Sequence, residues 1–355
     1  MKESINKLKQ SPLFNLSLSS KELFHSNFLA WFFEQNPEVA SDFFSRKTKF
    51  PLGKLKCVKR ENRNLDLVLD FEKHSIAIEN KIKSIPNEPQ LEKYKGRADI
   101  LLVLSIYEPQ NFGDYIFIHY EEIAGLFKEQ SKLVESAYLS GLYDDYSEFI
   151  NSLLKLTQEW KKMEKFDFHS NYNSGDEENN YHKLREIRIH DLYHKIKYNQ
   201  LVQLLFEATK KHISDEYRAN LEPFEYFSNS TGAASLWYYL VKDKKYIELQ
   251  IQDYSIRLMI VSPNCEPKKE KIAENKVIQQ IYSLFNEKAV KKITEDKLYP
   301  VNGSFNKFGG NVIHRYKKIN ETDTKKMVEA SSRFFAGAIK IAEKHKNELL
   351  ELFDN

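Results

Sequence analysis

The chain has 355 residues, of which 41% are hydrophobic and 30% charged, with a formal net charge of +3. This length allows two domains with a core each, and the nearly balanced charge neither requires nor excludes a polyanionic partner. Two distant cysteines, Cys57 and Cys265, exclude a disulfide framework and a cysteine-rich zinc site. No apolar run approaches the ~20 residues of a membrane span, and the N-terminus lacks an apolar signal core. We therefore expect a cytoplasmic protein that does not contact a membrane.

The first predicted element is a helix over residues 19–34. Ser19 or Ser20 can cap this helix, and its leucines and aromatic residues form a broad apolar surface. Glu22 lies in the first turn, where an acidic side chain complements the helix dipole. Glu22 therefore has a structural explanation as well as a functional one.

Two strands follow, over residues 64–70 and 76–82, and they carry the most informative side chains. Because side chains alternate along a strand, Glu79 and Lys81 share one face of the second strand. Asp66 lies on the polar face of the first strand. Two carboxylates and an ammonium group at a sheet surface can hold a hard divalent cation and a phosphate together, so this arrangement is typical of a phosphodiesterase.

The rest of the N-terminal half alternates strands and helices. A short helix is predicted at 88–96, followed by strands at 100–107 and 115–120 and by helices at about 121–130 and 132–164. The strand at 100–107 is continuously apolar, which is typical of a strand buried on both faces. These elements predict a mixed α/β sheet flanked by helices, with the charged site on its first two strands.

A polar stretch at residues 166–180 has almost no apolar content and is typical of a linker or an exposed loop. We therefore expect a catalytic domain over 1–165 and an α+β domain over 181–355 that selects a substrate or partner. In the second domain the pattern predicts helices and strands in the order helix 181–214, strands 235–241, 246–252 and 256–262, helix 270–287, strand 311–318 and helix 322–351.

Aromatic residues interleave with lysines in this second domain, at 237–239, 242–246 and 305–307. Such a surface can stack on bases and neutralise phosphates. The same pattern is found in a core strand with solvated edges, and this second interpretation is favoured on the sequence alone.

The charged constellation resembles the PD-(D/E)XK nuclease superfamily, the restriction-endonuclease-like phosphodiesterases. The resemblance covers about residues 19–120. It rests on Asp66 in one strand and on Glu79-x-Lys81 in the next. The proline that names the motif is absent, and Leu65 precedes the aspartate instead.

Three further residues match positions that related members carry. Glu22 matches an acidic residue on an N-terminal helix, whereas Gln90 and Tyr94 match a glutamine and a tyrosine on the helix after the lysine strand, at i, i+4 spacing. The resemblance implies that Gln90 and Tyr94 position backbone phosphate or brace Lys81. Tyr94 could equally be a core contact.

The resemblance implies hydrolysis of phosphodiester bonds that depends on Mg²⁺ or Mn²⁺, with DNA favoured over RNA as the substrate. Asp66 and Glu79 would coordinate the metal, and the backbone carbonyl of Asn80 would complete the set. Lys81 would orient the attacking water and stabilise the transition state. Glu22 would serve a second metal or fix the first through water. Double-strand cleavage by one site per chain would favour a homodimer.

Simpler explanations stay open beside this hypothesis. Glu79 and Lys81 could form an exposed ion pair, normally worth less than ~1 kcal/mol. The string Glu-x-Lys also recurs at Glu274 and Lys276 on a helical pattern, so it has weight only in combination with the other residues. The fold could also serve as a catalytically inactive module that binds nucleic acid or a partner, although the joint presence of all three charged residues argues against this.

Histidines give weaker signals. His190 and His194 copy the spacing of a zinc-protease motif, with aspartate in place of its general-base glutamate, but the surrounding pattern is that of an ordinary amphipathic helix. A metalloprotease is therefore the third and least favoured reading. His25 lies near an apolar helix surface, where we expect a packed side chain.

Overall fold

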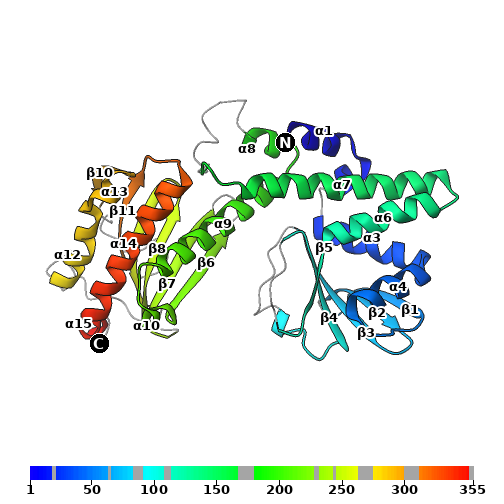
Figure 1. Cartoon of the computed structure of the whole chain (residues 1–355), viewed down its shortest axis with the longest axis horizontal. Helices are drawn as coiled ribbons and strands as arrows, with labels where there is room; N and C mark the ends of the chain where they lie inside the picture. The colour runs from blue at the N-terminus through cyan, green and yellow to red at the C-terminus, as the bar shows by residue number, and fades with distance from the viewer. Residues whose placement is uncertain are drawn as a thin grey trace. The chain divides into compact units, whose positions relative to one another are not determined.

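The structure is a computed structural model of the chain. It describes residues 1–17, 21–62, 65–82, 91–107, 113–166, 180–227, 232–242, 245–262, 275–299 and 312–351. The chain divides into two compact units (Figure 1). The first, the N-terminal unit, comprises Met1–Glu159 and Lys183–Leu192, and the second, the C-terminal unit, comprises Trp160–His182 and Tyr193–Asn355.

The N-terminal unit is built on a five-stranded sheet with the strand order β1-β2-β3-β4-β5. Its strands are β1 (Leu55–Asn62), β2 (Leu65–Phe71), β3 (Ser75–Lys81), β4 (Ile100–Ser105) and β5 (Ile116–His119). The first three strands pair antiparallel, whereas β3, β4 and β5 pair parallel. The sheet is therefore mixed, as the sequence predicts.

The helices of this part of the chain are α1 (Lys2–Gln10), α2 (Pro12–Ser17), α3 (Lys21–Gln35), α4 (Pro37–Thr48), α6 (Tyr120–Leu133), α7 (Ala137–Lys161) and α8 (Asn180–Glu186). Of these, α3, α4 and α6 contact the strands of the sheet (Figure 1). Helix α3 contacts β1, β2 and β3. Its aromatic side chains meet those of α6 and α7, because Phe28 and Phe32 both pack on Phe127 and Phe28 also packs on Tyr146. This aromatic core fixes α3 against the strands that carry the charged residues.

The strand that begins the sheet was not predicted. β1 has the sequence LKCVKREN, in which charged and polar side chains outnumber apolar ones, so it lacks the alternation that identifies a strand. It lies at the edge of the sheet, where only one neighbour is needed. Asp66 and Glu79 therefore lie on the second and third strands, and the expectation that they occupy the first two was wrong.

The C-terminal unit is built on a six-stranded antiparallel sheet with the order β10-β11-β9-β8-β7-β6. Its strands are β6 (Leu221–Phe227), β7 (Gly232–Val241), β8 (Lys245–Gln252), β9 (Ser255–Val261), β10 (Thr294–Tyr299) and β11 (Val312–Ile319). The meander predicted for its middle is confirmed as β7, β8 and β9. The two edge strands were missed, since β6 contains Pro223 and β10 begins with the polar run Thr-Glu-Asp-Lys.

The remaining helices are α9 (His190–Lys210), α10 (Asp215–Arg218), α12 (Lys276–Ser283), the 3₁₀ turn η2 (Leu284–Asn286), α13 (Lys288–Lys291), α14 (Thr324–Lys344) and α15 (Lys346–Glu351). One helix was expected over 181–214, but the structure has α8 and α9 with a break between them. Arg188 in that break has a left-handed φ of 54°, which no glycine or proline announces in the sequence.

The fold class predicted from the sequence is confirmed: a mixed α/β sheet flanked by helices accompanies a second unit that contains helices and an antiparallel sheet. Among the described residues, no helix is both long enough and apolar enough to cross a bilayer. Residues 167–179, which include most of the expected linker, lie outside the described residues.

Candidate functional site

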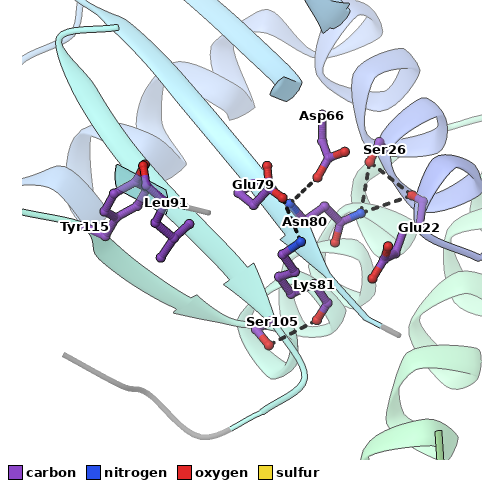
Figure 2. Close-up of polar contacts among 9 residues, drawn as sticks. All are labelled: Glu22, Ser26, Asp66, Glu79, Asn80, Lys81, Leu91, Ser105 and Tyr115. Carbon is purple, nitrogen blue, oxygen red and sulfur yellow. Dashed lines mark hydrogen bonds and ion pairs between the residues drawn. The ribbon is translucent and has the colours of Figure 1, made fainter. Parts of the chain in front are cut away.

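The pairing of β2 with β3 brings the two predicted carboxylates to one place. The antiparallel register sets Leu67 opposite Ile78, and one further step sets Asp66 opposite Glu79 on the same face of the sheet. The Asp66 carboxylate accepts a hydrogen bond of 2.6 Å from the backbone N–H of Asn80. This bond fixes the carboxylate at the end of β3, beside Glu79 (Figure 2).

Lys81 completes this group from the same strand. Its Nζ lies 2.7 Å from Oε1 of Glu79. The backbone carbonyl of Lys81 accepts a 3.0 Å hydrogen bond from the hydroxyl of Ser105, the residue opposite it on β4. Glu79 is only 4% exposed and Lys81 only 5%, so the explanation as an exposed surface ion pair does not hold. Burial of an ion pair is costly, and this cost favours a role for the pair beyond stability.

The electrostatics of the site differ from those of an ordinary ion pair. Burial, and after it the charge of Asp66, raises the pKa of Glu79 to about 7, although the charge of Lys81 acts in the opposite direction. Burial also raises the pKa of Asp66, against the hydrogen bond from Asn80 and the charge of Lys81. Burial thus makes it costly for both neighbouring carboxylates to be ionised at once.

These residues fit a divalent cation by the chemistry of their donors. Carboxylate oxygens are the preferred ligands of Mg²⁺, which is commonly held by one or two carboxylates while waters and substrate phosphate fill its other positions. A cation between Asp66 and Glu79 would stabilise the ionised forms that burial disfavours. Within the described ranges, no three His, Cys, Asp or Glu side chains form a group that could hold a metal ion, so the set offered here has two carboxylates.

Glu22 approaches this set from α3 but does not join it as a third carboxylate. Its charge contributes to the raised pKa values of both Asp66 and Glu79, after the larger effects already described. Its backbone carbonyl accepts a 3.3 Å hydrogen bond from the side-chain amide of Asn80. The helix therefore holds Glu22 beside the end of β3 (Figure 2).

The side chain of Asn80 was not expected to have a role. It connects β3 to α3 and α6 through hydrogen bonds. It turns to the face of β3 opposite to Glu79, as the alternation predicts, and it is buried. Its amide also donates to the hydroxyl of Ser26 on α3 at 3.0 Å, and its carbonyl oxygen accepts from the hydroxyl of Tyr120 on α6 at 2.7 Å. Asn80 thus couples the strand of Glu79 and Lys81 to the helix of Glu22.

The network continues into the core beneath the site. Tyr120 interacts with the hydroxyl of Tyr146 on α7, and that hydroxyl lies 2.8 Å from Nδ1 of His25. Burial lowers the pKa of His25 to about 3. His25 is therefore neutral at ordinary pH and packed among aromatic rings, which confirms the expectation from the sequence.

The supporting residues expected after β3 have different placements. Gln90 lies outside the described residues. Residues 91–92 are helical, and Tyr94 lies in the turn that follows them. Tyr94 is buried in a small apolar cluster with Val68, Ala77 and Val103, on the same face of the sheet as Glu79. The structure therefore supports the core contact that the sequence left open for Tyr94.

Tyr115 lies close to this group and was not predicted. Its hydroxyl donates a 2.7 Å hydrogen bond to the backbone carbonyl of Leu91, and burial, followed by the charge of Glu79, raises its pKa to about 12. No signal near Tyr115 marks it in the sequence, because its partners are distant along the chain. It ties residues 91–92 to the end of the sheet near Glu79 (Figure 2).

The other histidine pair gives no competing site. His190 and His194 lie one turn apart on α9, as the sequence predicts. Among the described residues, these histidines do not belong to any group of three potential metal ligands. The structure therefore gives no support for a zinc site on this helix.

Comparison with known protein families identifies the superfamily of the chain. No curated protein and no solved structure matches the chain. A family model described as the PD-(D/E)XK nuclease superfamily matches residues 13–228, which is more than half of the chain and includes the whole of β1 to β5 and α3. With an Asp-bearing strand paired to a Glu-x-Lys strand inside the matched region, this chain belongs to the PD-(D/E)XK nuclease superfamily.

Proposed function

We propose that the protein is a metal-dependent nuclease that hydrolyses phosphodiester bonds, with Mg²⁺ or Mn²⁺ as its cofactor and DNA favoured over RNA as its substrate. The single observation that carries the proposal is the group formed by the half-buried Asp66 and the buried Glu79 and Lys81 on one face of paired strands. Membership of the nuclease superfamily supports the reaction class.

Asp66 and Glu79 would hold the metal, together with the backbone carbonyl of Asn80. When bound, the ion would supply charge neutralisation at the scissile phosphate and a lowered pKa for a water molecule. Lys81, held 2.7 Å from Glu79, would orient the attacking water and donate to a phosphate oxygen. The burial of Lys81 strengthens such an interaction, since a low local dielectric screens it little.

The proposal gives three residues supporting roles. Glu22 would bind a second ion or hold the first through water, and the link from Asn80 to its backbone supports a fixed position for its helix. Gln90 and Tyr94 would position backbone phosphate near Lys81. For Tyr94 this role would be indirect, through the packing of the turn around residues 93–96.

At the level of domains, we propose that residues 1–165 form the catalytic domain and residues 181–355 form the domain that selects substrate or partner. The C-terminal sheet has no carboxylate–lysine group of the kind found on β2 and β3 among its described residues. A homodimer would let two such sites cut both strands of a duplex.

Cleavage assays with matched variants test this proposal. Plasmid, linear duplex, single-stranded DNA and RNA would be incubated with Mg²⁺, with Mn²⁺ or with EDTA. We expect cleavage only with metal, and losses of at least about a hundredfold for Asp66→Ala and Lys81→Ala, since the first removes a proposed metal ligand and the second removes a group that would act on the reacting phosphate.

Asp70→Ala supplies the control, because Asp70 lies on the same strand and face as Asp66 but pairs with Lys59 at 2.5 Å on the neighbouring strand. This variant should retain activity close to wild type. Equal inactivity of the wild type and all variants on every substrate would instead establish the inactive binding module as the function.

A further inference from the structure

The two faces of the C-terminal sheet carry different side chains. One face is apolar and lies under α9 and α14, which run across it (Figure 1). Its buried side chains include Leu236, Tyr238, Leu249 and Leu258, packed with those of the helices into one core. Side chains alternate along each strand, so the residues between these positions belong to the opposite face.

That opposite face is rich in aromatic rings. We call it the aromatic face and define it by side chains that share it through the strand register: Glu222, Phe224, Tyr226, Trp237, Tyr239, Tyr246, Glu248, Gln250, Gln252, Arg257, His314, Tyr316, Lys318 and Tyr299. The sequence alone favoured a core strand for the aromatic run at 237–239. The structure divides this run, because only Tyr238 enters the core while both of its neighbours take the aromatic face.

The rings form an ordered column across three strands. Phe224 on β6 stacks on Trp237 with a centroid distance of 4.2 Å and an interplanar angle of 20°, and Trp237 stacks on Tyr246 at 4.7 Å and 25°. The column ends on the edge strand β6, where Phe224 is 40% exposed and Tyr226 is 52% exposed. The outer side of Phe224 and the ring of Tyr226 are thus accessible to a planar ligand.

The two ends of the aromatic face differ in charge. At one end Lys242 lies 4.6 Å from the ring centre of Tyr239, but it forms an ion pair with Glu222, which offsets its charge. At the other end Tyr299 stacks on Tyr316 at 4.9 Å, and Lys297 and Lys318 approach the same Tyr299 ring at 4.8 and 5.5 Å. Lys297 and Lys318 therefore lie beside an aromatic ring. Such an arrangement suits a ligand that has both flat groups and negative charge.

Polar groups cross the middle of the aromatic face. The guanidinium of Arg257 donates to Gln250 at 3.1 Å and to Gln252 at 2.7 Å, and the amide of Gln250 donates to Glu248 at 3.2 Å. Burial raises the pKa of Glu248 to about 7, so its negative charge is reduced near neutral pH. Amide and guanidinium groups of this kind can meet the donor and acceptor edges of bases.

We infer that the aromatic face binds single-stranded nucleic acid, with unpaired bases stacking on Phe224 and Tyr226 and phosphates lying near Lys297 and Lys318. The six strands span about 24 Å at the usual strand spacing of about 4.8 Å, which is wide enough for several nucleotides. A duplex does not fit this chemistry, because its bases are stacked on one another and their faces are not available.

A purely apolar protein partner is less well matched to this surface. Its centre is polar and its Tyr299 end is cationic, whereas the core of a protein interface is depleted of charged residues. The choice of nucleic acid as the ligand rests on the proposed function of the N-terminal unit. The binding itself does not, because all residues of the aromatic face belong to the C-terminal unit.

Binding of fluorescent DNA to the full chain tests the inference. The background variant is Asp66→Ala in EDTA, so that cleavage cannot interfere. The probes are a single strand of roughly 20 nucleotides, longer than the ~4–16 that one such module covers, and the corresponding duplex. Adding Phe224→Ala and Tyr226→Ala should weaken single-strand binding at least about tenfold and leave duplex binding unchanged.

Tyr138→Ala is the matched control, since Tyr138 is 75% exposed on α7 in the N-terminal unit and should not affect binding. Lys318→Glu is a second test that does not depend on the rings, because this side chain is exposed and its substitution should preserve the fold. We expect a severalfold loss of single-strand affinity at low salt.

Unchanged single-strand affinity in both the double variant and Lys318→Glu overturns the inference, as does an equal loss for single strand and duplex. Failure of the proposed function would give a different result. In that case the wild type does not cleave with Mg²⁺ or Mn²⁺, but the variants of the aromatic face still bind single strands more weakly.

Discussion

Asn80 shows how one residue serves both faces of a strand. Its backbone N–H holds the Asp66 carboxylate at 2.6 Å on the side of the proposed metal site. Its side chain holds α3 and α6 on the other side through Glu22, Ser26 and Tyr120. Because a buried amide with unmet hydrogen bonds costs about 1–3 kcal/mol, this arrangement strongly favours one relative position of strand and helix.

The burial of His25 predicts how the stability of the protein depends on pH. Its pKa is about 3 in the folded protein, where burial disfavours the charged form, and about 6.5 in an unfolded chain. Between these values the unfolded chain binds a proton at this residue that the folded protein does not. The free energy of unfolding should therefore fall as the pH drops from about 6.5 towards 3, by roughly 1.4 kcal/mol per pH unit from this group.

Urea unfolding at pH 7, 6 and 5 measures this effect. His25→Gln retains a group that can hydrogen-bond to Tyr146 but cannot gain a proton, so its stability should fall less steeply with acid than that of the wild type. Parallel pH profiles for the two proteins would contradict the assignment of a buried neutral histidine.

At the scale of elements, two glycines test how closely helices approach their neighbours. Gly232 on β7 faces Tyr198 on α9, and a Cβ at this glycine would lie 2.5 Å from a carbon of that buried ring. Gly125 within α6 has no atom within 4 Å of the corresponding position. We expect Gly232→Ala to destabilise the protein by about 1–3 kcal/mol, because the ring must move within a packed core.

Gly125→Ala should instead stabilise the protein by roughly 0.5–1 kcal/mol, since alanine favours an exposed helix position over glycine. Chemical denaturation of both variants decides the matter. Unchanged or increased stability of Gly232→Ala would contradict the close packing of α9 on β7.

Element types were predictable where local pattern alone determines them. The alternation in β2 and β3 and the continuous apolar run of β4 identified three strands and placed Glu79 and Lys81 on one face. The edge strands β1, β6 and β10 were not predictable, because an edge strand needs little apolar content and is specified by its neighbour. The break between α8 and α9 depends on a left-handed Arg188, a conformation that this residue type does not signal.

At the scale of the whole molecule, the two units have separate sheets and cores, so a ligand of one should act mainly on that unit. Hydrogen exchange with and without Mg²⁺ or Mn²⁺ measures this. We expect metal to raise the protection of amides in β2 and β3 by up to about 2.7 kcal/mol at a hundred times the dissociation constant, because the ion binds the folded site only.

The strands β7, β8 and β9 of the C-terminal unit serve as the internal control and should show no change. Removal of the metal with EDTA should restore the original exchange rates, and Glu79→Gln should abolish the protection, because it removes one of the two proposed carboxylate ligands. Uniform protection of both units, or protection that persists in Glu79→Gln, would argue against a metal bound between β2 and β3.

The sequence by itself determined the strand character of the segments around Asp66 and Glu79 and the side of the strand that Glu79 and Lys81 share. These properties follow from alternation, which is local, and the superfamily was indicated by the resemblance of these residues to a known motif. Only the tertiary structure decided the burial of the charged group, the role of the Asn80 side chain and the face on which Trp237 lies. Each of these depends on contacts between residues far apart in the chain, such as Asn80 with Ser26 and Tyr120, and no local pattern specifies which distant surfaces will meet.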